Sequence, residues 1–299
     1  MNDFSKFNRI RNDVDRGSDF VTNVSEVSGE SGFRCLHILW LYPDVMNIHG
    51  GRGDIMGLLH ISNLLNVPVE IRRWDSLGKD VDWQWPHLVF MTAGELKCVP
   101  DVVSALNRQR EGLDDFIARG GYFIANGSSG GVLADQIELY NGKTVAGLGI
   151  LHMNWKERES VWGDDIWVKT SDGIDVIGNQ IQVADVTLAE GQEPFGKLVY
   201  GRGNDGAVSA DAIGKSDSID ISDVTGGSGL EGAKTGNVIY TSVLGPLITK
   251  NPKFTASLIT GAAANAGIEV AKSLADEDIE MELKSAEYIK SFMKEKMGE

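Results

Sequence analysis

The chain has 299 residues, of which 42% are hydrophobic and 24% charged, and its formal net charge is −15. This composition is typical of a soluble globular protein. The charge argues against binding to nucleic acid or to an anionic membrane, because phosphate groups repel such a surface. It keeps a protein soluble, and it is also compatible with a basic partner protein. No apolar run approaches the roughly 20 residues of a membrane span, and residues 1–30 lack the apolar core of a secretory signal. We therefore expect a cytoplasmic protein.

The cysteines and histidines give no metal-binding pattern. The two cysteines, Cys35 and Cys98, fit a reducing compartment. The five histidines show no HxxxH spacing, and no CxxC pair is present. The sequence therefore predicts no metal site.

The first half of the chain alternates between short apolar runs and helical patterns. Residues 1–32 are interpreted as a polar N-terminal extension. Strands are predicted at 35–41, 67–73, 87–92 and 122–125, and helices at 55–65, 99–119 and 132–139. Such alternation implies a parallel sheet with helices on both faces, and ligands at the carboxyl ends of the strands.

The second half has shorter, more alternating patterns. These predict partly antiparallel strands at 166–169, 180–188 and 198–200, a surface insertion at 207–230, a strand at 238–243 and a helix at 254–266. Residues 33–270 are taken as one domain. Residues 271–299 form a charged C-terminal helix that docks on its own domain or, as a less favoured alternative, on a partner.

Residues 120–131 (GGYFIANGSSGG) organise the chain, because an apolar run enters a turn of small residues and a helical pattern follows. An α/β enzyme presents its nucleophile at such a strand–turn–helix junction. If the bend lies at residues 125–127, the nucleophile's position is occupied by the methyl group of Ala125.

Several motifs together resemble one family in their order and spacing. They are LYPDVMN at 41–47, GRGD at 51–54, GLGIL at 147–151, PFGKL at 194–198, GRGN at 201–204, EGA at 231–233 and GPLITKNP at 245–252. On these motifs the chain resembles the cobyric-acid-synthase-type class I glutamine amidotransferases, and most of all the glutaminase subunits of lipid II isoglutaminyl synthases. The resemblance covers about residues 36–267 and implies a three-layer, flavodoxin-like α/β domain with a central, mostly parallel sheet.

The resemblance also implies a chemistry that this sequence has lost. The family uses a cysteine thiolate as nucleophile, a histidine as base and backbone N–H groups for the oxyanion. Its cysteine falls on Ala125, and two of its histidines fall on Gln182 and Leu244. A methyl group cannot attack a carboxamide, and a glutamine amide does not take up a proton near neutral pH. The sequence predicts a pseudoenzyme without catalytic residues.

A remnant of the family's pocket is expected around Gly94, Asn126, Gly127 and Ser128. Their backbone donors would resemble an oxyanion hole, although the glycines are equally well explained as residues that permit tight turns.

The resemblance further implies a hetero-oligomer with a Mur-ligase-like protein subunit. In such a complex, ATP and Mg²⁺ belong to the partner ligase, and this chain binds no cofactor. The chain would support or regulate the ligase without hydrolysing glutamine.

Two alternatives keep an active amidotransferase or hydrolase with a relocated nucleophile, for example in lipid II or cobyric-acid-type amidation. Residues 127–131 (GSSGG) satisfy G-x-S-x-G, which makes Ser129, with its neighbour Ser128, a candidate. Ser129 is nevertheless expected past the bend, where a hydroxyl more often starts a helix. His152 is the histidine that could lie near it. The second candidate, Cys98, lacks the strand–turn setting.

Overall fold

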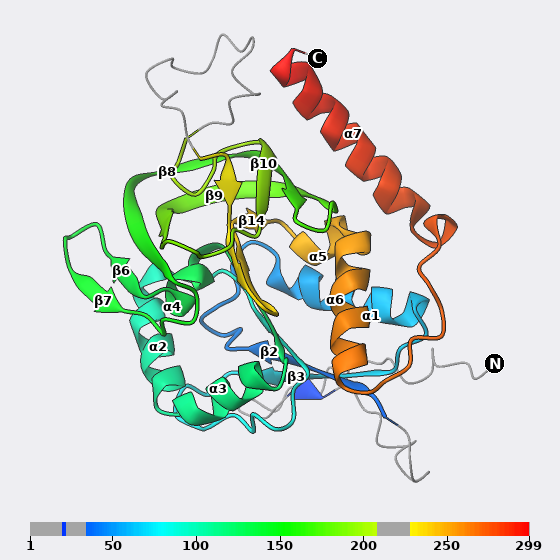
Figure 1. The fold of residues 1–299 in the computed structure, drawn as a ribbon, viewed down its shortest axis with the longest axis horizontal. Helices are drawn as coiled ribbons and strands as arrows, with labels where there is room; N and C mark the ends of the chain where they lie inside the picture. The colour runs from blue at the N-terminus through cyan, green and yellow to red at the C-terminus, as the bar shows by residue number, and fades with distance from the viewer. Residues whose placement is uncertain (1–19, 22–33, 208–227, 299) are drawn as a thin grey trace.

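The structure is a computed structural model that describes residues 20–21, 34–207 and 228–298. Within these ranges the chain forms two β-sheets with helices around them (Figure 1). The first sheet has seven strands in the order β1-β3-β2-β4-β5-β13-β12. Their bounds are Phe20–Val21 (β1), Val69–Trp74 (β3), Leu36–Leu41 (β2), Leu88–Met91 (β4), Tyr122–Asn126 (β5), Val238–Thr241 (β13) and Ala233–Thr235 (β12). The strands from β3 to β13 are parallel, while β1 and β12 are antiparallel at the edges.

Helices cover both faces of this sheet because its central strands are apolar at successive positions. In β2, Ile38 packs with the helices on one face and Leu39 with those on the other. The first face carries α1 (Gly51–Leu64), α5 (Leu247–Lys250) and α6 (Pro252–Asn265), and the second carries α2 (Val99–Asn107) and α3 (Arg110–Ala118). The predicted three-layer α/β class is confirmed.

The second sheet is built on a long antiparallel hairpin of β8 and β9. Its strands are Leu230–Glu231 (β11), Gly196–Tyr200 (β10), Met153–Thr170 (β8), Gln136–Glu138 (β6), Thr144–Ala146 (β7), Asp175–Leu188 (β9) and Val243–Leu244 (β14). The sequence predicted much shorter strands here. The first part of β8 alternates buried and exposed residues and carries many charges, so its apolar signal is weak although its backbone pairs along the hairpin.

Two predicted helices differ from the observed elements. The helix expected at 132–139 is only α4 (Gly130–Leu133), after which the chain extends into β6. The helix expected at 99–119 is interrupted between α2 and α3, where the backbone of Gln109 leaves the helical conformation. The Gln109 side chain accepts hydrogen bonds from the backbone of Val81 and the indole of Trp83 instead.

The C-terminal helix α7 (Glu280–Met297) follows a short 3₁₀ turn, Asp276–Ile279, and packs on its own domain. Met293 and Met297 are buried against a cluster that includes Trp167 and Tyr200 of the second sheet.

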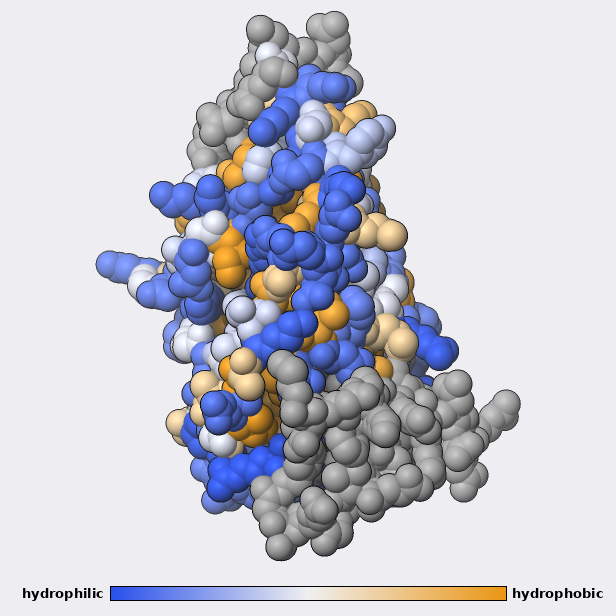
Figure 2. All heavy atoms as spheres, turned by 90° about the vertical axis from the view of Figure 1, so that its right-hand side faces the viewer, coloured by the Kyte–Doolittle hydropathy of each residue, from blue (hydrophilic) through white to orange (hydrophobic). Residues whose placement is uncertain are grey.

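The face seen in Figure 2 is mainly hydrophilic, with hydrophobic side chains dispersed among the charged ones.

The remaining predictions fall partly outside the described residues. Of the expected extension at 1–32, only Phe20–Val21 is described, and it pairs with β3 at the edge of the sheet. Residues 208–227 of the expected insertion lie outside the described ranges. None of the helices in the described part of the chain has the length and apolar character to cross a membrane.

Candidate functional site

The strand-to-helix bend lies at Gly127, the last of the three residues at which the sequence placed it and two residues after Ala125, the predicted nucleophile position. Strand β5 continues through Asn126, which pairs with Thr241, and a 3₁₀ turn begins at Gly127 (Gly127–Ser129). Gly127 has a φ of 60°, a left-handed conformation that glycine adopts without the usual steric cost. Ala125 lies inside the strand and its side chain is in the core. The residue at the bend therefore has no side chain at all.

Two apolar side chains occupy the space into which a side chain at the bend would project. A Cβ atom built on Gly127 would lie 2.9 Å from Cβ of Ala93 and 3.0 Å from Cδ2 of Leu244. Leu244 reaches this position on β14, which pairs with β9. Hence the structure brings together the bend and position 244, to which the resemblance assigned a histidine, and has glycine and leucine there.

Gln182, the other position at which a histidine was expected, is buried on β9. Its amide nitrogen donates to the carbonyl of Gly203 at 3.1 Å and to Oδ1 of Asp185 at 3.4 Å. Its Oε1 has no hydrogen-bond partner in the described structure. These bonds direct the side chain to the loop after β10, and none of them joins it to residues 127–129.

The polar groups around the bend are hydrogen-bonded to one another. The Gly94 N–H donates to Oγ of Ser128 at 2.8 Å, and that hydroxyl donates to the Gly94 carbonyl at 2.7 Å. The Ala93 N–H donates to Oδ1 of Asn126 at 3.1 Å. An oxyanion hole needs donors directed at an open position. Here the donor expected from Gly94 is already bound to a buried serine.

The alternative nucleophiles are not hydrogen-bonded to a histidine in the described structure. Ser129 is fully buried, and its hydroxyl lies 2.8 Å from the Asn126 carbonyl and 3.0 Å from that of Met91. His152 is exposed, with Nδ1 at 3.3 Å from Oδ1 of Asp135. Cys98 ends a 3₁₀ turn, Leu96–Cys98, and is half-buried. Within the described ranges, no hydrogen bond joins Ser128, Ser129 or Cys98 to an imidazole.

Two buried carboxyl groups hold the loops near this end of the sheet, and the sequence did not single them out. Glu231 accepts hydrogen bonds from Oγ1 of Thr241 and from N and Oγ of Ser242, at 2.6–2.9 Å. Asp54 accepts one from the Ile248 N–H at 2.7 Å. Burial raises the pKa of both carboxyl groups to about 7. Both lie in motifs that carry the family resemblance, GRGD and EGA, which was the available signal.

A group of potential metal ligands lies elsewhere. In the described residues, Cys35, His37 and Glu70 are the three metal-ligating side chains that come together, at the amino ends of β2 and β3. They lie at the opposite end of the sheet from the bend, because the carboxyl ends of parallel strands lie together at one end of the sheet and the amino ends at the other.

Comparison with known proteins identifies the kind of protein that this chain resembles. No protein-family model matches it. It is 24% identical over 243 residues to subunit GatD of the glutamine-hydrolyzing lipid II isoglutaminyl synthase of Streptococcus pneumoniae, a match covering 81% of this chain and 85% of that protein. The chain is thus similar to GatD along most of its length. The predicted resemblance is confirmed.

The chain is also similar to several solved structures, all at low sequence identity. PurLQS from Thermotoga maritima is 14% identical, with a TM-score of 0.48 over 76% of this chain and 99% of that chain. A glutamine amidotransferase from Thermotoga maritima is 10% identical, with a TM-score of 0.44 over 89% of this chain and 96% of the other.

Proposed function

We propose that the chain is a non-catalytic, glutamine amidotransferase-like subunit that supports or regulates a Mur-ligase-like partner in an amide-forming ligase complex. The observation that carries the proposal is the glycine at the strand-to-helix bend, with the Leu244 side chain against it. Similarity to GatD, which is itself named as a subunit, supports the assignment to a complex.

The chemistry explains why this arrangement would not hydrolyse glutamine. The family's reaction begins with attack by a thiolate on the carboxamide carbon, and Gly127 offers no attacking atom. The leaving ammonia must receive a proton, and the Leu244 side chain carries none to donate. Loss of the nucleophile alone removes most of the rate of a covalent route, so loss of the base adds little.

In this proposal the partner carries the ligase chemistry, and ATP and Mg²⁺ are assigned to it. The chain would provide a surface that binds the ligase and would stabilise the complex. Amide formation would then depend on free ammonia, because this subunit supplies none from glutamine.

The first test is the release of ammonia from glutamine by the purified full-length chain and by the complex that co-purifies with it from the native cell. No release above the protein-free background is expected in either case. Amide formation by the complex should proceed with ammonium chloride and fail with glutamine. A chain that runs alone as a monomer and has no co-purifying ligase would refute the assignment to a complex.

The competing proposal, a relocated nucleophile at Ser128, Ser129 or Cys98, predicts the opposite result. Glutamine turnover that is abolished by Ser129→Ala or by Cys98→Ser would establish it and overturn ours. The matched control is Ser291→Ala, an exposed serine on α7, which should leave any turnover unchanged.

Restoring the lost groups tests whether the bend is the inherited position. Gly127→Cys combined with Leu244→His supplies a thiol and an imidazole at adjacent positions, and it also replaces the leucine that a Cβ at 127 would contact. We expect the introduced thiol of the double variant to react faster with a glutamine-analogue chloroketone than Cys98 does. The variant Ala125→Cys should show no such labelling, because its side chain is in the core.

A further inference from the structure

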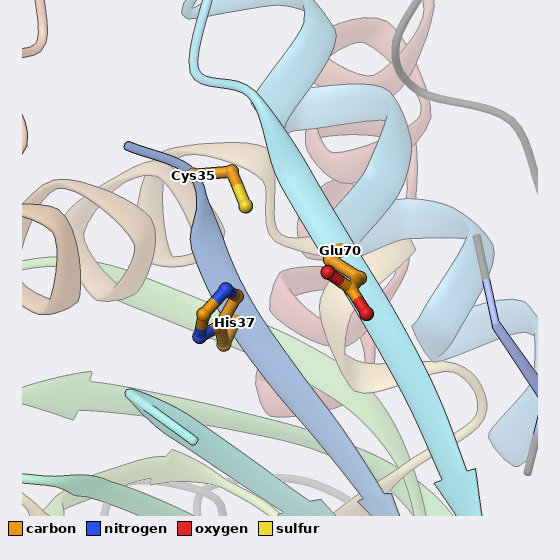
Figure 3. Close-up of side chains that lie close together, drawn as sticks. All are labelled: Cys35, His37 and Glu70. Atoms are coloured by element: carbon orange, nitrogen blue, oxygen red, sulfur yellow. The ribbon is translucent and has the colours of Figure 1, made fainter. Parts of the chain in front are cut away.

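Three potential metal ligands lie together where the first sheet begins. Cys35 directly precedes β2, His37 is its second residue, and Glu70 is the second residue of β3. Parallel pairing places His37 opposite Glu70, and the period of two along a strand puts positions 35 and 37 on the same side. Figure 3 shows the thiol, the imidazole and the carboxylate side by side at these strands. All three residues are half-buried, and their ligand atoms lie within 4.8 Å of one another.

The imidazole of His37 is held in a tautomer that leaves one ring nitrogen able to bind a metal ion. Its Nδ1 lies 2.9 Å from the carbonyl oxygen of Trp85. Because a carbonyl oxygen only accepts, Nδ1 carries the proton and Nε2 keeps its lone pair. The ring stacks on that of Trp85 and on that of His87, with centroids 4.5 and 4.8 Å away. Histidines that bind metal ions usually donate their other ring N–H to a carboxylate or backbone carbonyl, as His37 does here.

The carboxylate of Glu70 is oriented by a neighbouring arginine. Nε of Arg72 donates to its Oε1 at 2.9 Å, which leaves Oε2 available. The Arg72 guanidinium in turn lies over the ring of Trp85, 4.1 Å from its centroid. The outer contacts of Glu70 and His37 therefore meet on Trp85, so both are fixed by one small group of residues.

From these contacts we propose that Cys35, His37 and Glu70 bind one Zn²⁺ ion, with water as the fourth ligand. A thiolate, an imidazole and a carboxylate suit zinc, whereas a thiolate disfavours Mg²⁺ and Ca²⁺. A thiolate and a carboxylate together neutralise the charge of the ion. Binding replaces the thiol proton of Cys35, which is released to the solvent.

Only a small movement of the side chains is needed to form this site. In a tetrahedral zinc site the ligand atoms are about 3.6 Å apart, so atoms up to 4.8 Å apart must approach by about 1 Å. Rotation about the side-chain bonds of Cys35 and Glu70 supplies this, while the stacked His37 stays in place. The bound ion would link the amino ends of β2 and β3 and so stabilise the folded state.

The experiment uses the full-length chain after treatment with a chelator, titrated with Co²⁺ and then with Zn²⁺. We expect one equivalent of Co²⁺ to give a sulfur-to-cobalt charge-transfer band, one equivalent of Zn²⁺ to abolish it, and zinc to raise the unfolding temperature. Cys35→Ser should lose the band and bind zinc about 100-fold more weakly or worse. Cys98→Ser, the matched control at the chain's other cysteine, should behave like the wild type.

The proposal is overturned if the wild type shows no charge-transfer band, or if Cys35→Ser retains the band and Cys98→Ser loses it. Glu70→Gln gives a separate measurement should Cys35→Ser fail to fold. It should keep the band, because the thiolate remains, but weaken zinc binding by about 10-fold or more. Unchanged zinc affinity in Glu70→Gln would likewise refute the three-ligand site.

Discussion

The two ends of the central sheet differ in what their polar side chains do. At the carboxyl end, around Gly127, the serine and asparagine groups are hydrogen-bonded to neighbouring backbone atoms, and Leu244 closes the remaining space. At the amino end, Cys35, His37 and Glu70 are held by outer contacts with their ligand atoms near one another. The polar groups at the carboxyl end, where the resemblance placed the chemistry, are thus satisfied by one another, whereas the amino end has side chains that could bind a ligand. Substitutions at the carboxyl end should therefore lower the free energy of unfolding, whereas substitutions at the amino end should change it little.

The largest effect is expected from filling the space at Gly94. A Cβ atom there would overlap the carbonyl oxygen of Val45 and the side chain of Met46. Gly94→Ala should lower the free energy of unfolding by about 3 kcal/mol, because a packed loop has no room for the methyl group. Gly78→Ala is the control, since its nearest atom would be 4.0 Å away. Urea denaturation of both variants measures the difference. Equal stabilities would show that the loop around Gly94 has room for a methyl group.

An effect of the same order, a few kcal/mol, is expected from the pH dependence contributed by Asp54. Its pKa is raised by burial from 3.8 to about 7, so between these values the native state holds a proton that the unfolded state has lost. Stability from this group is therefore full below pH 4 and decreases as the pH rises to about 7. Asp54→Asn keeps the acceptor for the Ile248 N–H and should flatten this decrease. Denaturant melts of both proteins from pH 4 to pH 8 test it, and parallel pH profiles would contradict the assignment.

Removal of the serine hydroxyl at the bend should cost about 1–2 kcal/mol. Ser128→Ala leaves the buried Gly94 N–H without its partner, and an unsatisfied buried donor costs about that amount. Ser291→Ala on the exposed side of α7 should change stability by less than about 0.5 kcal/mol. Equal stability of Ser128→Ala and this control would mean that the Ser128 hydroxyl does not satisfy the Gly94 N–H. That N–H could then act as an oxyanion donor.

The smallest effect is expected at the amino end. In the presence of a chelator, Cys35→Ser should change the free energy of unfolding by less than about 0.5 kcal/mol, because a hydroxyl of similar shape replaces a half-buried thiol. The same denaturation experiment measures it. A loss above about 2 kcal/mol without metal would mean that the thiol is part of the core, and the contrast between the two ends would disappear.

The order of elements was readable from the sequence because it depends on local periodicity. Continuous apolar runs in the first half predicted parallel strands buried on both faces, and those strands are present. The length of strand β8 was underestimated, since its charged, solvent-facing residues mask the apolar alternation. The short helix α4 was overestimated, because apolar spacing over a few residues does not separate a helix from a turn followed by a strand.

The sequence by itself determined that residues 120–131 contain no cysteine and that position 244 carries no imidazole. Those facts are local and do not depend on the fold. Only the tertiary structure decided that the bend falls on Gly127, since this depends on how far β5 pairs with β13, a strand more than a hundred residues away. It also decided that Leu244 covers the bend and that Glu70 meets Cys35 and His37. Such contacts join segments distant in the chain, and no local pattern specifies them.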